Sequence, residues 1–400
     1  RPKPRTTSMA SKRSNIAGND RRGKRLRCNS RAVDDDYFKG YSGIEIHEQM
    51  LKDQVRTKAY REAIFENRSR IEGKAVLDVG CGTGILSLFA RDVGARVVYA
   101  VDASDMADYA RKIVEVNGAS DVIKVIRGKI EEIELPEKVD VIISEWMGYF
   151  LVYETMLSSV IFARNRWMRP DGIMLPTEAT LFLGAFSWPE KIQEHIGCWR
   201  RMYGYDFTPL LPLASRSLIE EPIVEMLTPQ QEVTESEPIL HLDLRTVEEK
   251  DLVEWKANAT LKAIISARVY GVFAWFEVQF PRSKPDTKER SSKVEKEFDD
   301  SGLILSTSPE DEPTHWAQTI FFFENFPLLE QDDRLETKLN VKTNAQNPRL
   351  LDIEVSWRHQ PDTTRTSRNN LKEAKKNDDT CAASVQTPSL DWKKSNYKMQ

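Results

Sequence analysis

Residues 76–84 of the chain read VLDVGCGTG. An apolar run ends there in three closely spaced glycines, Gly80, Gly82 and Gly84, and the helix-like segment ILSLFARDV follows directly. Glycines have no Cβ atom, so they allow a tight turn and let a ligand approach the backbone closely. The stretch therefore predicts a buried strand, a ligand-binding turn and a helix.

Carboxylates around this turn indicate which ligand it binds. Asp78 stands beside the glycines, where a carboxylate suits a cationic amino group and repels a pyrophosphate; the turn therefore favours S-adenosyl-L-methionine over NAD. Asp102 ends the next apolar run, where an acid can accept hydrogen bonds from both ribose hydroxyls. The alternative role for Asp102 is the N-cap of the following helix. Glu131, or its neighbour Glu132, follows the third run and can accept from the adenine amino group.

Sequence patterns on both sides of the turn predict two folded domains. From 74 to 176, apolar runs alternate with helical segments, which favours a parallel sheet with helices on both faces. After 176, short alternating runs separated by polar turns are typical of an antiparallel sandwich or barrel. The expected organisation is a disordered basic tail at 1–33, N-terminal helices and a Rossmann-like cofactor domain at 34–176, a β-barrel domain at 177–360, and a disordered polar tail at 361–400.

Charge is distributed unevenly along the chain. Residues 1–33 carry eleven Lys and Arg and one acid, and residues 361–400 carry eight basic and five acidic residues. The body between them therefore has a formal charge of −17 within a net charge of −4. Such a body repels nucleic acid and attracts basic partners, or it serves solubility alone. The cluster KRLR at 24–27 is either a nuclear signal or part of a solvated tail, so nucleus and cytoplasm are the expected compartments.

Several classes of protein are not expected from this sequence. No run of about 18 apolar residues suggests a membrane span. The first residues, RPKPRTTSMASKRSN, lack the apolar segment of a secretory signal. Four cysteines, Cys28, Cys81, Cys198 and Cys381, lie far apart, which predicts neither a disulfide framework nor a metal site and favours a reducing compartment.

The fourth apolar run ends in SEWMGYFLVYE, in which Glu145 and Glu154 bracket a loop. The loop after the fourth strand lies at the C-terminal edge of such a sheet, beside the cofactor. An arginine guanidinium is planar, always charged and rich in donors, so two carboxylates can bind it from two sides. The pair predicts an arginine acceptor; the alternative is two surface glutamates on a loop.

With these features the sequence resembles the protein arginine methyltransferase family over roughly residues 34–360. The motifs that carry the resemblance are YFKGY at 37–41, HEQMLKDQVRTKAY at 47–60, VLDVGCGTGILS at 76–87, SEWMGYFLVYETML at 144–157 and THW at 314–316. The resemblance implies methyl transfer from S-adenosyl-L-methionine to guanidino nitrogens of arginine in proteins, with S-adenosyl-L-homocysteine as the cofactor product. It also implies a type I enzyme that makes asymmetric dimethylarginine on Arg-rich partners such as histone tails.

The family's cofactor-site roles carry over to individual positions of this chain. A cover over the cofactor, or a direct contact to it, is implied for Tyr37, Phe38, Tyr41, His47 and Arg56. Among these, Arg56 would meet the cofactor's carboxylate. Met50 and Met156 would shape the pocket around the accepting nitrogen.

The resemblance also implies contacts between the two domains. Asp53 and His315 would pair across them, and Trp316 would wall the acceptor cleft. The proton lost on methylation would go to His315, to Glu154 or, late, to water. One departure from the family pattern is Asp102, where close relatives carry Glu; the shorter acid still reaches a diol, so cofactor affinity can differ while the role survives.

A helical segment, PEKIQEHIGCWRRMYGYDF, interrupts the strands of the second domain. Ile192, Ile196, Trp199 and Tyr203 recur in it at helical spacing, which predicts one apolar stripe. The resemblance implies a dimerisation arm at about 188–212 that docks on a second protomer, and a cis proline at Leu175-Pro176. Packing of the stripe on its own barrel is the alternative to a homodimer.

Two other functions are weighed against arginine methylation. A methyltransferase for a small molecule or nucleic acid fits poorly, because neutral acceptors need no paired carboxylates and the acidic body repels nucleic acid. A metal-dependent methyltransferase would show metal ligands, and none cluster in the sequence. A non-catalytic scaffold would be expected to lose Asp78, a loop glycine or one of the paired glutamates, and all are present.

Overall fold

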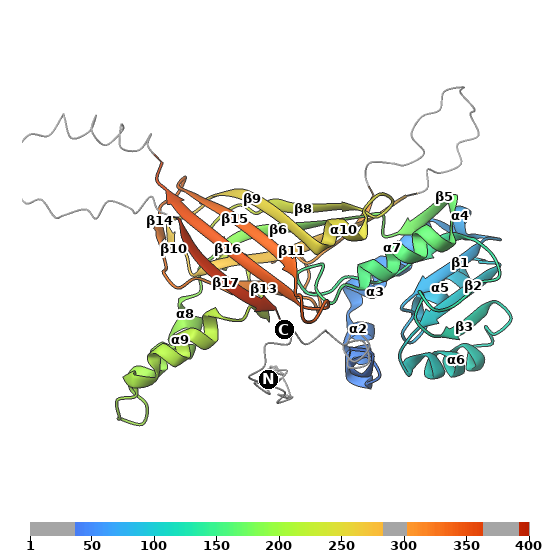
Figure 1. The fold of residues 1–400 in the computed structure, drawn as a ribbon, viewed down its shortest axis with the longest axis horizontal. Helices are drawn as coiled ribbons and strands as arrows, with labels where there is room; N and C mark the ends of the chain where they lie inside the picture. The colour runs from blue at the N-terminus through green and yellow to red at the C-terminus, as the bar shows by residue number, and fades with distance from the viewer. Residues whose placement is uncertain (1–36, 283–301, 363–391, 400) are drawn as a thin grey trace, which may run out of the picture.

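The structure, a computed structural model, describes residues 37–282, 302–362 and 392–399. Its first unit, blue to green in Figure 1, follows the alternating pattern of the sequence. Its elements are α2 (Ile44–Lys52), α3 (Gln54–Glu66), α4 (Arg68–Ile71), β1 (Ala75–Val79), α5 (Ile85–Asp92), β2 (Val97–Asp102), α6 (Met106–Val116), β3 (Ile123–Arg127), β4 (Val139–Ile143), α7 (Met156–Trp167) and β5 (Met168–Leu175).

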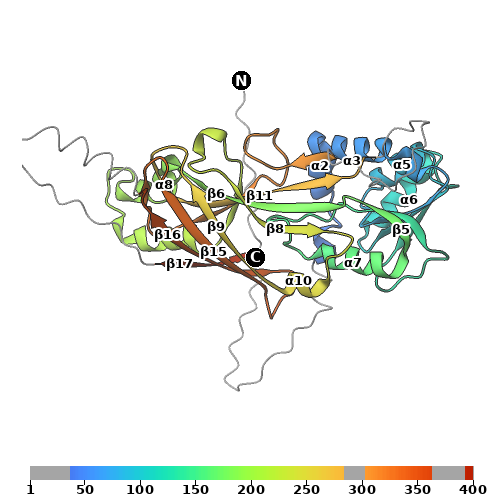
Figure 2. The same cartoon turned by 90° about the horizontal axis from the view of Figure 1, so that it is seen from above.

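The strand before the glycine turn, β1, lies at the centre of this unit. The sheet has the order β3-β2-β1-β4-β5, and every neighbouring pair is parallel. All of β1 is buried because helices cover both faces of the sheet, α3 and α5 on one side and α7 on the other (Figure 2). The strand order reverses at β1, and open α/β sheets bind their ligands at such a switch point.

The second unit, which extends to the left in Figure 1, contains mostly antiparallel strands. Its strands are β6 (Glu178–Phe186), β7 (Ile223–Glu225), β8 (Glu237–Asp243), β9 (Glu254–Lys262), β10 (Ala267–Arg268), β11 (Gly271–Phe280), β12 (Leu303–Ser306), β13 (Gln318–Phe322), β14 (Leu328–Leu329), β15 (Arg334–Thr343), β16 (Leu351–Gln360) and β17 (Lys393–Met399). Its helices are α8 (Pro189–His195), α9 (Leu211–Ile219) and α10 (Glu249–Val253), with 3₁₀ turns at Gly197–Arg200, Thr208–Leu210 and Pro229–Gln231.

Two larger sheets enclose the core of this unit. One has the order β7-β13-β11-β6-β8, with β12 beside β11, and the other has the order β17-β16-β15-β9. Buried and less buried residues alternate along β15 and β16, as expected for strands with one face on a core. The predicted fold class, a Rossmann-like domain followed by an antiparallel barrel, is confirmed. Leu175-Pro176 at the junction is cis, as predicted. None of the described helices is long and apolar enough to cross a membrane.

Three expectations about this second unit are corrected. Residues 393–399, assigned to a disordered tail, form β17, because Ser395, Tyr397 and Met399 alternate inward and the Tyr397 hydroxyl donates to the carbonyl of Phe322 (2.7 Å). The strand β15 and the short strands β7, β10, β12 and β14 were not expected either. The tail at 1–33 lies outside the described residues, as do 363–391.

The third correction concerns the arm at 188–212. It is not one helix with one apolar stripe: α8 ends at His195, a 3₁₀ turn follows, and a second helix, α9, completes the arm. Ile192 and Ile196 pack on the barrel, whereas Tyr203 lies at the arm's far end and is 93% exposed. The spacing predicted continuity, but Gly197 and Gly204 interrupt the helical pattern; Gly204 has a left-handed φ of 89°.

Candidate active site

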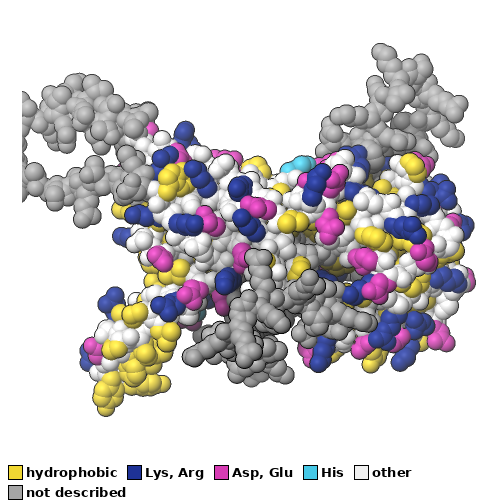
Figure 3. Space-filling model, in the orientation of Figure 1, with side chains coloured by type: hydrophobic (Ala, Val, Ile, Leu, Met, Phe, Trp, Pro, Cys, Tyr) yellow, Lys and Arg dark blue, Asp and Glu magenta, His cyan; other side chains and the backbone are white. Residues whose placement is uncertain are grey.

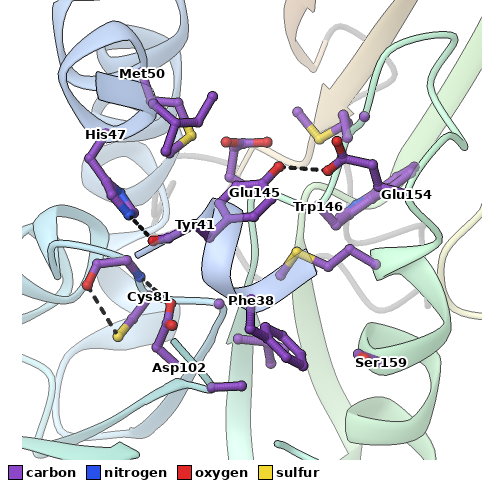
Figure 4. Close-up of a pocket in the computed structure, with 18 of the residues that line it drawn as sticks. Phe38, Tyr41, His47, Met50, Cys81, Asp102, Glu145, Trp146, Glu154 and Ser159 are labelled. Atoms are coloured by element: carbon purple, nitrogen blue, oxygen red, sulfur yellow. Dashed lines mark hydrogen bonds between the residues drawn. The ribbon is translucent and has the colours of Figure 1, made fainter. Parts of the chain in front are cut away.

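A single cavity of about 330 Å³ gathers most of the residues that the sequence indicated. Its size is in the range of small-molecule sites. It opens at the C-terminal edge of the parallel sheet, between α2, the glycine turn and the loop after β4 (Figure 4). Lining it are the predicted Tyr37, Phe38, Tyr41, His47, Met50, Arg56, Gly80, Gly82, Asp102, Glu131, Glu145, Glu154, Met156, His315 and Trp316. Three predicted residues, Asp53, Asp78 and Gly84, lie behind its walls.

The glycine turn forms the floor of the cavity. A Cβ atom on Gly80 (φ 73°) would lie 2.2 Å from the Met156 Cε, so a side chain there would fill the space. Asp102 holds the turn from the next strand: one carboxylate oxygen accepts from the Gly82 amide (2.8 Å) and the other from the Ser104 amide (2.8 Å). Asp102 is not the cap of α6, whose N-cap is Asp105. Its position on the cavity wall is compatible with the predicted ribose contact.

Asp78 lies beneath the turn and does not reach the cavity. Its side chain is fully buried and accepts a hydrogen bond from the Ser87 hydroxyl (2.6 Å). Burial raises the pKa of Asp78 to about 7, although the Ser87 hydroxyl lowers it. Its Oδ1 atom has no hydrogen-bond partner among the described residues. Asp78 does not line the cavity in this structure, so the direct contact with a ligand amino group that the sequence suggested stays a prediction.

Of the two candidate adenine-side acids, only Glu131 lines the cavity. Its side chain lines the cavity and accepts a hydrogen bond from the Ser159 hydroxyl of α7 (2.6 Å). Glu132 is exposed and does not line the cavity. The contact with an adenine amino group stays a prediction for Glu131.

The aromatic segment at 37–41 covers the cavity on the side of α2. The Tyr41 hydroxyl donates to Glu154 Oε2 (2.6 Å), and the Tyr41 carbonyl lies 2.9 Å from His47 Nε2 (Figure 4). His47 is buried, and its ring edge would lie 3.2 Å from a Cβ on Gly82. The segment therefore connects the glycine turn to the loop after β4.

That loop, from Glu145 to Glu154, is an irregular structure fixed by the barrel. Phe150, Leu151 and Glu154 adopt left-handed φ values of 53°, 63° and 72°, which are uncommon for residues other than glycine. The Phe150 ring enters the barrel core, stacked on Trp255 of β9 and edge-on to Phe321 of β13. We infer that the barrel, more than the loop's own sequence, sets the positions of the two glutamates.

The two glutamates have different partners. Oε2 of Glu145 accepts from Nε (2.9 Å) and Nη2 (2.8 Å) of Arg56, and both side chains are less than 10% exposed. Arg56, predicted to meet the cofactor's carboxylate, thus contacts the acceptor loop while still lining the cavity. Burial raises the pKa of Glu154, and the neighbouring Glu145 adds to this, whereas the Tyr41 hydrogen bond and the Arg349 guanidinium oppose it.

The predicted pair between the domains forms. His315 lies in the loop before β13, and its backbone amide and Nδ1 both contact Oδ2 of Asp53 (2.8 and 2.7 Å). Asp53 also caps α3 by accepting from the Arg56 amide (2.9 Å). Burial opposes ionisation of Asp53, but the hydrogen bonds from His315 outweigh it and lower the pKa of the carboxyl group. Trp316 walls the cavity and donates to the carbonyl of Met147 (2.9 Å).

Among the lining residues that were not predicted is a charged one, Arg349. Arg349, from the loop between β15 and β16, lines the cavity beside Glu154 and the aromatic segment. Arg349 lies 195 positions after Glu154, the last residue of the loop that follows β4, and it belongs to none of the motifs. Sequence periodicity therefore gave no signal for it.

The arrangement suits a sulfonium cofactor and a guanidinium acceptor. Glycine backbone and the carboxylates of Asp102 and Glu131 line the cavity, and Glu145 and Glu154 lie at the end away from Asp102 (Figure 4). Two carboxylates can hold one planar cation from two sides. Within the described residues, no group of three or more His, Cys, Asp or Glu side chains is placed to hold a metal ion.

Comparisons with known proteins agree with this geometry. Residues 177–363 match the family model of the arginine methyltransferase oligomerization subdomain, and residues 62–161 match that of ribosomal protein L11 methyltransferase. The chain is 42% identical over 339 residues to a probable protein arginine N-methyltransferase 6 of Arabidopsis thaliana, covering 80% of this chain and 78% of the relative. It is 40% identical over 323 residues to protein arginine N-methyltransferase 1 of Saccharomyces cerevisiae, covering 80% and 87%.

Solved structures give the same result. The PRMT1 enzyme–prozyme heterotetrameric complex of Trypanosoma brucei with AdoHcy superposes with a TM-score of 0.72 at 34% identity, covering 90% of this chain and 100% of that chain. Arabidopsis thaliana protein arginine methyltransferase 10, described in an open conformation, superposes with a TM-score of 0.73 at 32% identity, covering 91% and 100%.

Proposed function

Because this chain belongs to the protein arginine N-methyltransferase family, and so methylates arginine with S-adenosyl-L-methionine, we propose that Glu145 and Glu154 hold the acceptor guanidinium and that the enzyme is type I. The observation that carries the proposal is the placement of two carboxylates, the nearly buried one of Glu145 and the half-buried one of Glu154, in the cavity whose floor is the glycine turn. A guanidinium between them gains two charge-assisted contacts in a site shielded from water.

The residues of the chain act mainly by placement. When bound, S-adenosyl-L-methionine supplies an electrophilic methyl group on its sulfonium. Glu145 and Glu154 orient one terminal nitrogen of the acceptor toward that methyl group and draw the positive charge to the other nitrogens, which frees a lone pair. Alignment and exclusion of water supply most of the rate. Met50 and Met156, which line the cavity, shape the space around the accepting nitrogen.

Removal of the acceptor proton has two candidates in the chain. His315 lines the cavity, and the contact of its Nδ1 with Asp53 orients the ring. The other ring nitrogen, Nε2, is then the atom that would accept the proton. Glu154 is the second candidate, because burial raises the pKa of its carboxyl group and makes it a stronger base. Replacing His315 with Gln separates them: turnover that falls by less than about tenfold assigns the proton to Glu154 or water.

Type I activity predicts asymmetric dimethylarginine as the end product. The test is mass spectrometry of an Arg-rich histone-tail peptide incubated with the enzyme and S-adenosyl-L-methionine, with the Arg→Lys peptide as control. Monomethylarginine should appear first and asymmetric dimethylarginine should follow. Symmetric dimethylarginine, or accumulation of the monomethyl product alone, would contradict the assignment.

We further propose that the arm makes a homodimer. Tyr203, Tyr205 and Leu213 are 93%, 73% and 64% exposed, and hydrophobic side chains gather at the tip of the arm (Figure 3). A second apolar set, Tyr109 and Val116 on α6, is exposed on the cofactor domain. Aromatic side chains commonly anchor interfaces, and two arms related by a two-fold axis would close a ring. The match to an oligomerization subdomain supports this assembly.

Substrates and location follow from charge. The body of the chain is acidic, which favours basic, Arg-rich protein partners such as histone tails over nucleic acid. We propose that the enzyme acts in the nucleus, in the cytoplasm, or in both, according to whether KRLR at 24–27 is a nuclear signal. Imaging a fluorescent fusion with and without alanines at 24–27 tests this. If the nuclear fluorescence is unchanged, KRLR is not a nuclear signal.

A further inference from the structure

Arg349 reaches the active site from a barrel loop whose conformation is held by side-chain hydrogen bonds. The loop joins β15 to β16. The Asn344 side-chain amide donates to both carboxylate oxygens of Asp352 (3.0 and 3.1 Å), and its own oxygen accepts from the amide of Asn347 (3.0 Å). The Asn347 side chain accepts from the Arg349 amide (3.0 Å). These hydrogen bonds hold the backbone of Arg349 without any contribution from its side chain.

Arg349 satisfies both backbone polar groups of Glu154. Its Nη1 donates to the Glu154 carbonyl (2.9 Å), and its own carbonyl accepts from the Glu154 amide (3.1 Å). Glu154 needs such support because its φ of 72° is in the left-handed region. Held backbone geometry is what directs the Glu154 carboxylate to the cavity, since the residue lies outside any helix or strand.

The same guanidinium covers the aromatic segment. The Arg349 Cζ atom lies 3.7 Å from the ring centroid of Tyr37 and 5.4 Å from that of Phe38. A guanidinium at this distance is attracted to the face of an aromatic ring, more so where water is excluded. Three parts of the chain that are remote in sequence meet at this one side chain: the barrel loop, the end of the acceptor loop and the cover over the cofactor.

We propose that Arg349 is a positioning residue that couples closure of the aromatic cover to the orientation of Glu154. The proposal rests on the assigned role of Glu154 in holding the acceptor. When the segment at 37–41 is closed, Tyr37 stacks on Arg349 and Tyr41 bonds the Glu154 carboxylate. When it is open, Arg349 loses its aromatic partners and Glu154 loses the Tyr41 hydroxyl. The acceptor site is thus complete only over a covered cofactor site.

Charge supports the same coupling. The titratable and charged groups that interact with the Glu154 carboxyl are the hydroxyls of Tyr37, Tyr41, Tyr149 and Tyr153, the carboxylate of Glu145 and the guanidinium of Arg349. Burial is the main cause that raises the pKa of Glu154, and Arg349 lowers it. Removing Arg349 therefore raises the pKa of Glu154 further, so the acidic limb of the pH–rate profile moves to higher pH.

The test uses the full-length enzyme and an Arg-rich peptide. Arg349→Ala should lower kcat by at least about tenfold, because a small displacement of an orienting group is enough to misalign the acceptor. It should also shift the acidic limb upward and speed amide hydrogen exchange at 37–43. Arg349→Lys keeps the charge but not the planar stacking surface, so it should restore the pH limb and leave kcat low. The control is Arg334→Ala, which removes an exposed arginine at the other end of β15.

A double-mutant cycle measures the coupling itself. Tyr37→Leu removes the ring face that Arg349 contacts. If the two residues are coupled, the fold-loss in kcat of the double variant should be smaller than the product of the fold-losses of the two single variants. Independent effects, or an Arg349→Ala enzyme with wild-type kcat and exchange, would overturn the proposal. So would faster exchange spread over β15 and β16, which marks a structural role only. Glu154→Gln, run in parallel, separates the two hypotheses: if it keeps full turnover, the acceptor assignment fails, whereas the exchange data still report on the cover.

Discussion

Replacing Glu154 with Gln tests the acceptor site most directly, because it removes charge and keeps shape. A glutamine oxygen can still accept the Tyr41 hydroxyl that now donates to Oε2 at 2.6 Å. What is lost is the attraction between a half-buried carboxylate and a cationic acceptor. Loss of one preorganised electrostatic contact typically lowers kcat by about 10²–10³, or roughly 2.7–4 kcal/mol. We therefore expect turnover to fall by at least about 10² while binding of S-adenosyl-L-homocysteine barely changes.

Stability should respond in the opposite direction. Burial raises the pKa of Glu154 in the folded state above its unfolded value, so the ionised side chain is a cost to folding once the pH exceeds the folded-state pKa. A neutral amide removes that cost, and the Tm of Glu154→Gln at neutral pH should equal or exceed the wild-type Tm. Glu145→Gln should instead lower the Tm, because Arg56 is buried and would lose its anionic partner.

Three measurements on the same preparations decide this: steady-state kinetics with an Arg-rich peptide, calorimetry with S-adenosyl-L-homocysteine, and thermal unfolding. The reasoning is refuted if Glu154→Gln keeps kcat within about threefold of wild type, well short of the loss expected for a preorganised charge. It is also refuted if Glu154→Gln unfolds at a lower temperature than Glu145→Gln, because of these two glutamates it is Glu145 that forms the buried ion pair with Arg56.

Three further changes have definite expected outcomes. Gly80→Arg should abolish S-adenosyl-L-homocysteine binding, because even a Cβ there would lie 2.2 Å from its nearest neighbour; Gly118→Ala, at another positive-φ glycine with open space around it, should cost about 1–2 kcal/mol of folding and leave binding intact in calorimetry. Asp102→Ala should weaken cofactor binding by roughly 1–3 kcal/mol, and wild-type affinity would exclude a ribose contact. Tyr205→Ser with Leu213→Ser should give a folded monomer of low activity; light scattering that still shows a dimer would place the interface elsewhere.

The sequence predicted those parts of the site that sit at fixed places in a regular fold. Asp102 and Glu131 end or follow strands of a parallel sheet, and the carboxyl ends of such strands meet at one edge. The order and direction of the strands therefore place both residues in the same cavity as the glycine turn. Asp78 shows the limit of that reasoning: it occupies the expected strand, but alternation along β1 directs its side chain beneath the turn and toward Ser87.

Features that depend on tertiary contacts were not predictable from local patterns. Helical spacing joined Ile192 to Tyr203, yet the arm turns after α8. The strand β17 is largely polar in sequence, and its place in the barrel depends on pairing with β16 and on the burial of Ser395, Tyr397 and Met399. Arg349 joins a loop whose conformation comes from Asn344, far from any motif. In each case the deciding interaction links residues whose separation carries no periodic signal.

The insertion of Phe150 into the barrel core changes how substitutions in that core will behave. Trp255 and Thr319 do not line the cavity, but one stacks on the Phe150 ring and the other accepts a hydrogen bond from its amide (3.1 Å). In a saturation mutagenesis screen scored by product formation, these two positions should be as intolerant as the residues that touch the acceptor. A variant effect map of this enzyme would then show a cluster of sensitive positions inside the barrel core. These positions support the loop that carries the two glutamates and do not themselves contact the substrate.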